Sequence, residues 1–337
     1  MTPSTAITST TKRQKTALIT GCSSGIGYHA ALELASKGYK VFACARRLEP
    51  MEPLKKAYPG QIITFSMDVS SIESVNKGYD FVFAELGGAS SSDANTDSSS
   101  GSGSAHESPH SVPKLDVLYN NAGQPCTFPA IDISESAMQQ CFEVNIHGPI
   151  RLTKRFAPLV IASQGTIVFT GSVAGVSPFP WGSMYASSKA ALHQFANCLS
   201  LEMEPFNVRV LNVITGGVNT GIADTRPMPL DSVYLDSEEG RTMFAYRKNM
   251  TDSSSLMSPE KYAAAVVKKI EKHHLFKVDY YEGSYSWILP WLQFLAPRWL
   301  FFAYLRKKFM LNDGWRVLRE RFVGSGVHDV LESKKLV

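Results

Sequence analysis

The sequence predicts a doubly wound α/β fold, in which one parallel sheet is covered by helices on both faces. Short, almost wholly apolar segments alternate with helical patterns, as expected for strands that are buried on both sides. The first of these segments runs directly into a glycine-rich turn that opens a helix. A sheet of this kind binds its ligands outside the carboxyl ends of the strands.

The elements follow one another in a regular order. The predicted strands are 16–20, 40–45, 62–69, 115–123, 165–172 and 208–217. The predicted helices run from the glycine-rich turn to Lys37, from the third strand to about Leu86, from Ser134 to Leu159, and around Tyr185. With 337 residues the chain can hold one such domain plus extensions. We place the domain at residues 16–282, after a polar, disordered segment at residues 1–15.

A Ser/Gly-rich segment interrupts the alternation at residues 87–111. It has almost no large apolar side chains, so it cannot bury enough surface to fold, and we expect a disordered insertion. A long loop adds little closure entropy, so the domain can tolerate it. A phosphorylated regulatory segment is the alternative.

Composition excludes several classes of protein. The net charge of +4 is too small to indicate nucleic-acid binding, and we expect no nucleic-acid partner. The five cysteines show no metal-ligand spacing, and neither does the His273-His274 pair, so we expect no metal. The first residues are polar and lack the apolar core of a secretory signal. These features favour a protein that faces the cytosol.

The glycine-rich turn, TGCSSGIG at residues 20–27, predicts a dinucleotide site. Gly21, Gly25 and Gly27 allow a tight turn and a close approach of the backbone to a diphosphate. The N–H groups at the start of the following helix favour an anion. Ser23, Ser24 and Ile26 complete the turn.

Two arginines indicate which dinucleotide binds. Arg46 and Arg47 end the second strand, where folds that prefer NAD carry an acid. A guanidinium can instead bind a 2′-phosphate through paired hydrogen bonds, which favours NADPH. A solvated basic turn is the alternative. Asp68, after the third strand, is expected near the adenine, unless it only forms a turn.

Tyr185 and Lys189 are four residues apart in the sequence YASSK. Taken alone, the pair is also compatible with one turn of an ordinary Ala-rich helix. At this spacing both side chains lie on one helix face, so Lys189 could place a cation near the phenol oxygen. A nearby positive charge lowers the pKa of a tyrosine, which is ordinarily near 10.

Several motifs together resemble those of the short-chain dehydrogenase/reductase family. They are TGCSSGIG, NNAG at residues 120–123, Asn145, the Gly-Ser pair at 171–172 and YASSK. Their order and spacing match the family over residues 16–223. A narrower resemblance is to fungal NADPH-dependent reductases of lipid ketones within that family. One departure is the pair Gly216-Gly217 in place of the usual Pro-Gly, which we expect to loosen the turn under the nicotinamide.

The resemblance implies a Rossmann-type fold and a set of functional residues. Tyr185 is expected to donate the proton, Ser172 to hydrogen-bond the substrate oxygen, and Lys189 to hold the nicotinamide ribose. Asn145 is expected to hold a water that connects Lys189 to solvent. The residues expected to contact NADPH or NADP+ are Gly21, Ser23, Ser24, Gly25, Ile26, Gly27, Arg46, Arg47, Asp68, Asn121, Ala122, Gly123, Tyr185, Lys189, Val218 and Thr220.

The narrower resemblance implies reduction of the ketone of an acylated dihydroxyacetone phosphate to lysophosphatidic acid, in glycerolipid biosynthesis. Reduction of a retinoid- or steroid-like carbonyl is one alternative, and a non-catalytic NADPH-binding membrane protein is another. Four cations could meet a substrate phosphate, although neighbouring acids nearly cancel their charge: Arg226, Arg241, Arg247 and Lys248. The chain could also form homo-oligomers.

The C-terminal region departs most from a soluble enzyme. Residues 283–312 carry no acid and many aromatic side chains, and a basic cluster lies near their end at residues 306–308. Pro290, Pro297 and Arg298 interrupt the run, which disfavours a spanning helix. Aromatic and basic side chains suit a membrane interface, so we predict a membrane-associating hairpin or helix pair, followed by a tail at residues 313–337. A substrate-pocket lid or a dimer contact is the alternative. Together with the resemblance, this predicts the cytosolic face of the endoplasmic reticulum membrane and of lipid droplets.

Overall fold

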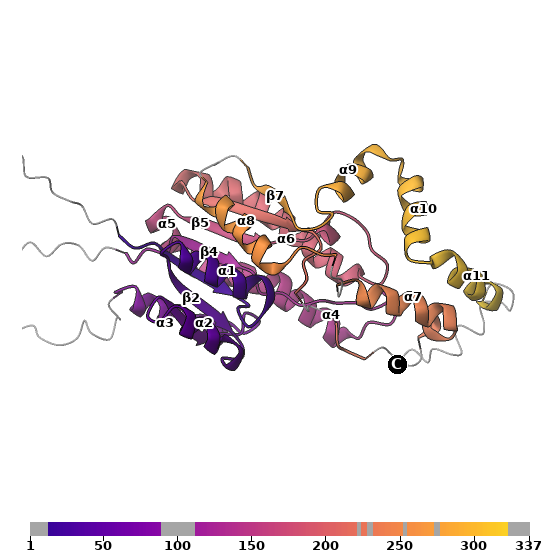
Figure 1. Cartoon of the computed structure of the whole chain (residues 1–337), viewed down its shortest axis with the longest axis horizontal. Helices are drawn as coiled ribbons and strands as arrows, with labels where there is room; N and C mark the ends of the chain where they lie inside the picture. The colour runs from indigo at the N-terminus through magenta and orange to yellow at the C-terminus, as the bar shows by residue number, and fades with distance from the viewer. Residues whose placement is uncertain are drawn as a thin grey trace, which may run out of the picture.

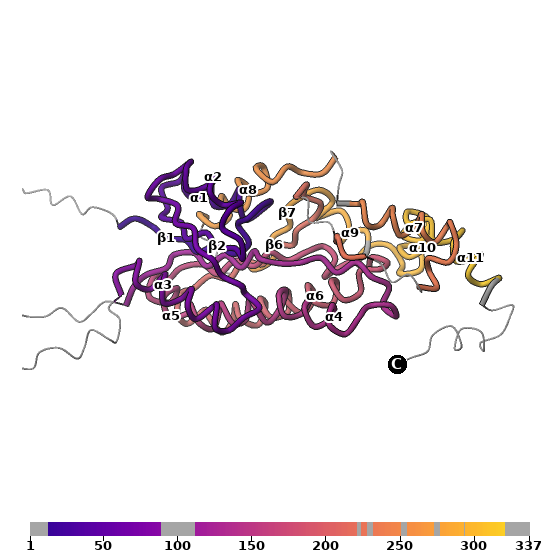
Figure 2. Tube along the Cα trace, turned by 90° about the horizontal axis from the view of Figure 1, so that it is seen from below, coloured from indigo at the N-terminus to yellow at the C-terminus, as the bar shows by residue number. Residues whose placement is uncertain are grey.

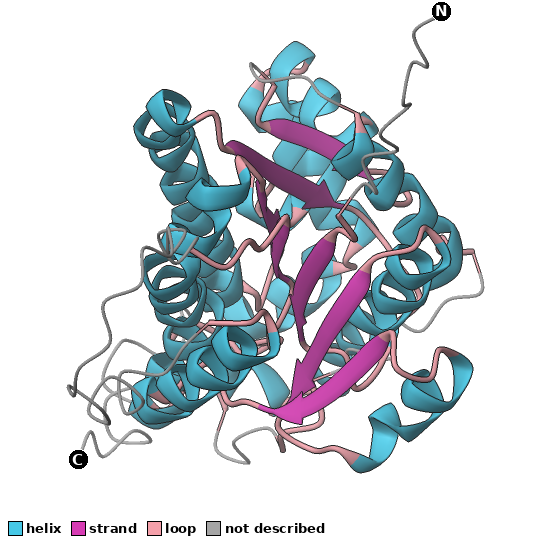
Figure 3. Cartoon of the chain, turned by 90° about the vertical axis from the view of Figure 1, so that its left-hand side faces the viewer, coloured by secondary structure: helices cyan, strands magenta, loops and turns pink. Residues whose placement is uncertain are grey.

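The strands of the central sheet run parallel in the order β3-β2-β1-β4-β5-β6-β7. Figure 3 shows the strands of this sheet with helices on either side. The computed structural model describes residues 13–88, 112–220, 224–227, 232–251, 255–272 and 277–322. The strand bounds are β1 Thr16–Thr20, β2 Lys40–Ala45, β3 Ile62–Ser66, β4 Val117–Asn120, β5 Thr166–Thr170, β6 Arg209–Thr215 and β7 Asp279–Glu282. The predicted doubly wound sheet is confirmed, and it contains a seventh strand that the sequence analysis did not predict.

The strand β7 was not predicted because its sequence, DYYE, is short and polar. It pairs only with β6, at the edge of the sheet, so its side chains are not buried on both faces as those of β1 or β6 are. An edge strand therefore lacks the continuous apolar run that identifies the central strands.

Helices cover both faces of the sheet (Figures 1 and 2). One layer contains α1 Gly25–Ser36, α2 Glu52–Ala57 and α8 Pro259–Glu271. The other contains α3 Ile72–Glu85, α4 Glu135–Phe142, α5 Gly148–Ser163 and α6 Ser183–Met203. Each layer has its own buried core, with Leu34 and Tyr262 on the first face and Phe156 and Phe169 on the second. Burial of these large side chains is the main stabilisation of the sandwich.

The helix predicted from Ser134 to Leu159 is not continuous. It consists of α4, a π-helical turn at Glu143–His147, and α5. Pro149 explains the break, because proline has no N–H to donate to the carbonyl one turn earlier, at Asn145. Such π turns are frequent at functional sites, and this one contains Asn145.

The turn after β6 is held firmly, contrary to the expectation that Gly216-Gly217 would loosen it. The N–H of Gly217 donates to the carbonyl of Ser284 at 2.8 Å, and the N–H of Ser284 donates to the carbonyl of Gly217 at 3.0 Å. A Cβ at residue 216 would lie 2.2 Å from the oxygen of Ser284. Glycine is therefore needed here because another backbone segment packs against the turn.

The remaining helices lie together at the carboxyl ends of the strands, on the right of Figure 1. They are α7 Glu238–Lys248, α9 Ile288–Leu295, α10 Arg298–Lys308 and α11 Leu311–Phe322. A third core cluster joins α7, α10 and α11 to the domain, with Phe301 and Phe309 packed among Trp181, Met243 and Phe244.

α11 begins just before the predicted C-terminal tail and forms its first part. Residues 1–12, 89–111 and 323–337 lie outside the described chain, so the predicted disorder of the N-terminus and the insertion stays a prediction. Within the described residues, no helix is long and apolar enough to cross a bilayer.

Candidate active site

The glycine-rich turn between β1 and α1 has the backbone that a diphosphate site requires. Gly21 and Gly25 have φ values of 74° and 60°, which glycine adopts without strain. A Cβ on Gly21 would lie 2.9 Å from the Cα of Ala122, and one on Gly25 would lie 3.0 Å from the Cβ of Thr220. The predicted residues Ala122 and Thr220 therefore do border the turn.

Asn121 fastens this turn to two further strand ends. Its Nδ2 donates to the carbonyl of Thr20 at 2.9 Å, and its Oδ1 accepts a hydrogen bond from Thr170 Oγ1 at 3.1 Å. The N–H of Ala122 also donates to Thr20 Oγ1, at 2.9 Å. The observed role of Asn121 is thus to align the ends of β1, β4 and β5, and the predicted cofactor contact stays a prediction.

The residues predicted to select the cofactor lie at the carboxyl ends of neighbouring strands. Arg46 and Arg47 directly follow β2, next to β1 in the sheet, and both are exposed. Asp68 Oδ1 accepts hydrogen bonds from the N–H and the hydroxyl of Ser70, at 2.9 and 2.7 Å. Asp68 therefore forms a turn, and its predicted place near the adenine stays a prediction, while exposed guanidinium groups suit a 2′-phosphate.

Three residues of α6 share one face of that helix, since they are spaced four apart: Tyr185, Lys189 and His193. Lys189 is buried, and its Nζ donates to the carbonyl of Thr170 at 2.8 Å. Burial lowers the pKa of Lys189 to about 8, so its charge is retained at neutral pH but lost in mildly basic solution. Ser172, just beyond β5, hydrogen-bonds the phenol of Tyr185.

The pKa of Tyr185 behaves differently from the expectation based on Lys189. Burial raises this pKa above its ordinary value, and the groups that lower it are the Ser172 hydroxyl and the charge of Arg247. The Nζ of Lys189 is 5.7 Å from the centre of the Tyr185 ring and is bonded to Thr170 instead. The charge of Arg247 thus lowers the pKa of Tyr185, and the expected effect of Lys189 on this pKa stays a prediction.

His193 is a positioning residue that sequence reasoning missed. Its Nε2 accepts a hydrogen bond from the N–H of Ser172 at 3.0 Å. Burial, together with the charge of Lys189, lowers the pKa of His193 to about 4, so the imidazole is neutral and can accept. A Cβ on Gly171 or on Gly175 would lie 2.6 Å from this ring. The sequence contained one signal for His193, because it continues the four-residue spacing of Tyr185 and Lys189.

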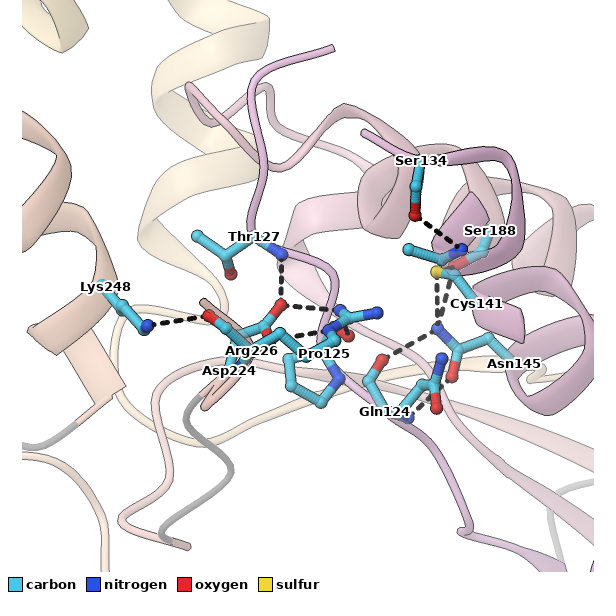
Figure 4. A network of polar contacts seen from close by, with 11 residues as sticks. Gln124, Pro125, Thr127, Ser134, Cys141, Asn145, Ser188, Asp224, Arg226 and Lys248 are labelled. Atoms are coloured by element: carbon cyan, nitrogen blue, oxygen red, sulfur yellow. Dashed lines mark hydrogen bonds and ion pairs between the residues drawn. The ribbon is translucent and has the colours of Figure 1, made fainter. Parts of the chain in front are cut away.

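Asn145 lies fully buried at the centre of a polar network (Figure 4). Its Oδ1 accepts from the N–H of Gln124 at 2.9 Å, and its Nδ2 donates to the Gln124 carbonyl and to Ser188 Oγ, both at 3.1 Å. A Cβ on Gly123 would lie 3.3 Å from Asn145 Oδ1 and 3.6 Å from Lys189 Nζ. Gly123 therefore lies between the amide and the ammonium, where the predicted water would have to bind.

Two thiols contribute to the electrostatics of this network. The buried pair Cys126 and Cys141 packs against Tyr185. A hydrogen bond from Cys126, the Ser188 hydroxyl and the Lys189 charge lower the pKa of Cys141, whereas burial raises it.

A second polar cluster borders a pocket of about 550 Å³ beside these residues. Arg226 binds Asp224 through Nε at 2.9 Å and Nη2 at 2.7 Å, and Asp224 also accepts from the N–H of Thr127 (Figure 4). Although burial opposes it, Arg226 and these hydrogen bonds hold the pKa of Asp224 below its usual range. The pocket is lined by Phe128 and also by polar side chains, among them Asp132 and Arg226. Phe128 packs with the Cys126–Cys141 pair, and so does Tyr185.

Together these groups can bind a carbonyl oxygen and transfer a proton to it. Tyr185 and Ser172 offer two hydroxyls at one point, and neutral His193 holds the loop that carries Ser172. The glycine-rich turn and the exposed arginines lie along the same edge of the sheet. This arrangement suits a reductase that uses a dinucleotide.

Comparison with known proteins agrees with the geometry. The family model for short chain dehydrogenases matches residues 15–90 and 96–229. The chain is 44% identical over 309 residues to a NADPH-dependent 1-acyldihydroxyacetone phosphate reductase of Saccharomyces cerevisiae, covering 91% of this chain and 95% of that protein. It is 32% identical over 263 residues to the protein of the same name in Schizosaccharomyces pombe, covering 76% and 78%.

A short-chain dehydrogenase from Streptomyces avermitilis has the same fold, with a TM-score of 0.68 and 24% identity. That likeness covers 90% of this chain and 98% of the other. The fold, the motifs and the family match all agree, and the chain belongs to the short chain dehydrogenase family.

Proposed function

We propose that the protein reduces the ketone of 1-acyldihydroxyacetone phosphate to 1-acylglycerol 3-phosphate, with NADPH as the cofactor. The observation that carries this proposal is the 44% identity, over nearly the full length of both chains, to the yeast reductase whose name states that activity and cofactor. The product is lysophosphatidic acid, a precursor of glycerolipids.

The active-site residues then have the following roles. NADPH supplies the hydride that the carbonyl carbon accepts. Tyr185 donates its phenolic proton to the carbonyl oxygen, and because burial raises its pKa, the phenol is protonated at neutral pH as this step requires. Ser172 donates a hydrogen bond to the same oxygen as negative charge develops there. Lys189 holds the nicotinamide ribose, and Asn145 holds the water that links Lys189 to solvent.

The cofactor site fits NADPH. Gly21, Gly25 and Gly27 have no side chains, and a Cβ at any of them would crowd a neighbouring residue. A diphosphate can therefore meet the backbone of this turn. Arg46 and Arg47 supply the positive charge that a 2′-phosphate needs.

The helix pair α9–α10 is the proposed membrane anchor. Phe294 is 81% exposed and Trp299 is 69% exposed, and Trp287 and Trp291 are exposed with them. Arg306, Lys307 and Lys308 lie in the last turn of α10. Exposed aromatic rings beside cations suit the interface of an anionic membrane or lipid droplet. The proposed location is the cytosolic face of the endoplasmic reticulum membrane and of lipid droplets.

The test is NADPH oxidation by the purified protein with a panel of carbonyls. The panel contains 1-acyldihydroxyacetone phosphate, retinal and a ketosteroid, and the Tyr185→Phe variant is the matched control. We expect the acylated ketone phosphate to have the highest kcat/KM, and the Phe variant to lose at least about a hundredfold in kcat while still binding NADPH. Preference for retinal or the steroid would contradict the substrate, and normal turnover by the Phe variant would contradict the proton donor.

A further inference from the structure

One arginine lies on the packed face of the amphipathic helix α7. The buried residues of α7 are Gly240, Met243 and Phe244. Arg247 follows Met243 by four positions and Phe244 by three, so it lies on the same face, and it is partly buried. A charged side chain on the packed face of a helix costs free energy unless it has a specific partner.

The guanidinium lies against the loop that leads into α6. Arg247 Nε donates to the carbonyl of Pro180 at 3.1 Å, and its Cζ is 6.0 Å from the centre of the Phe179 ring. A Cβ on Gly182 would lie 3.1 Å from Arg247 Nη2, so glycine leaves room for the guanidinium at this point. Tyr185 is three residues farther along the chain from Gly182, in the first turn of α6.

The charges of Arg247 and Tyr185 affect each other's pKa. Burial lowers the pKa of Arg247, and the charge of a Tyr185 phenolate would raise it; reciprocally, Arg247 lowers the pKa of Tyr185. Among the described residues, no carboxylate lies within 4.0 Å of Arg247. The charge of this cation is thus not balanced by an acid in the described part of the chain.

The other three candidate cations of this region are hydrogen-bonded to protein groups, and one of them is exposed. Arg226 is bound to Asp224. Lys248 Nζ donates to the carbonyl of Arg226, at 3.2 Å. Arg241 is exposed and donates to the carbonyl of Leu235. The sequence left four candidates for a substrate phosphate, and among them Arg247 is the one that contacts the loop leading into α6 and Tyr185.

We propose that Arg247 binds the phosphate of the substrate, an inference that rests on the proposed function. In 1-acyldihydroxyacetone phosphate only one methylene and one ester oxygen separate the ketone carbon from the phosphorus. A ketone bound at Tyr185 must therefore carry its phosphate close to that hydroxyl, where Arg247 supplies the charge. A guanidinium binds phosphate through paired, charge-assisted hydrogen bonds, and the dianion would compensate the buried cation.

The experiment compares two substrates that differ only in the phosphate: 1-acyldihydroxyacetone phosphate and 1-acyldihydroxyacetone. The measured quantity is the ratio of their kcat/KM values, for the wild type, Arg247→Gln, Arg247→Lys and the matched control Arg241→Gln on the same helix. We expect the wild type to prefer the phosphorylated ketone and Arg247→Gln to reduce this preference by roughly tenfold to a hundredfold. Arg247→Lys keeps a positive charge and should retain part of the preference, and Arg241→Gln should retain all of it.

The outcomes separate this inference from the proposed function. If the wild type reduces neither ketone, the proposed function is wrong and the inference falls with it. If the wild type prefers the phosphorylated ketone and Arg247→Gln keeps that preference, only the inference is overturned. An equal loss on both substrates also overturns it, because Arg247 would then act through Tyr185 or the loop at Pro180.

Discussion

His193 holds the backbone of Ser172 only while its imidazole is neutral. Protonation would place an N–H where the ring now accepts a hydrogen bond, in a buried site next to Lys189. Successive turns of α6 thus carry the proton donor Tyr185, the cation Lys189, and His193, which positions the loop. At the residue scale, the chemistry of the site depends as much on this support as on the reacting groups.

The lowered pKa of His193 predicts a dependence of stability on pH. Its pKa is about 4 in the folded state and near 6.5 when unfolded, so between these values the unfolded chain binds more protons. The contribution of His193 to stability is therefore highest above pH 6.5 and falls as the pH decreases toward 4. The variant His193→Gln keeps an acceptor but does not titrate. Between pH 7 and pH 5 we expect its free energy of unfolding to fall by about 2 kcal/mol less than that of the wild type. Urea denaturation of both proteins at the two pH values measures this difference, and parallel losses would exclude His193 as the source.

Arg46 provides a second test at the residue scale. Arg46→Ala should weaken NADPH binding by roughly tenfold to a hundredfold, because a charged hydrogen bond contributes about 1.5–3 kcal/mol. NADH lacks the 2′-phosphate, so its affinity should hardly change. Fluorescence titration with both cofactors measures the effect, and Arg47→Ala shows whether its neighbour shares the role. An equal loss of both cofactors would mean that Arg46 only supports the turn after β2.

At the element scale, α9 and α10 differ in how they contact the domain. Phe301 and Leu305 of α10 are buried in the third core cluster, whereas the aromatic residues of α9 face outward. In Figure 1 the pair lies at the carboxyl ends of the strands, the same end as the active site. Deleting the whole region would therefore disrupt packing as well as remove the proposed anchor.

Point substitutions test the anchor without that complication. Trp291, Phe294 and Trp299 are exposed, so changing all three to Ser should leave the fold intact. Each large apolar side chain contributes about 1.5–3 kcal/mol when buried, so partitioning onto vesicles should fall at least about tenfold. Flotation with vesicles of phosphatidylcholine and phosphatidylserine measures this.

The matched control changes three exposed apolar residues elsewhere on the surface to Ser: Ile72, Leu201 and Phe206. The control should float as the wild type does, and NADPH binding and the unfolding temperature verify the fold of both variants. If both triple variants float equally well, α9 and α10 are not the anchor.

At the scale of the whole molecule, the described flanks of the Ser/Gly-rich segment and the active site lie at opposite ends of the sheet. A helix that follows a parallel strand returns to the amino end, so the described flanks of the segment, Gly88 and Val112, lie there. Figure 1 shows the end of α3 and the start of β4 on the side opposite α7 and α10.

This arrangement predicts that the segment can be removed. Replacing residues 90–110 by a short Gly/Ser linker should leave kcat/KM unchanged, and the shorter loop should raise the free energy of unfolding by about 1 kcal/mol. Denaturation and the NADPH oxidation assay measure both quantities. A large loss of stability or activity would show that the segment packs on the domain.

The sequence by itself determined the doubly wound sheet, its apolar strands, the glycine-rich turn and the motif that contains Tyr185 and Lys189. These features depend on local patterns, because burial on both faces and a bare turn restrict residue type at fixed positions. Tertiary structure alone decided the edge strand β7, the bonding of Asn121 and His193, and which arginine lies against the loop before Tyr185. Each of these is a contact between segments far apart in the chain, so its energy depends on a partner that no local pattern identifies. Arg247 and Arg241 look alike in the sequence, and only the packing of α7 against the loop before α6 distinguishes them.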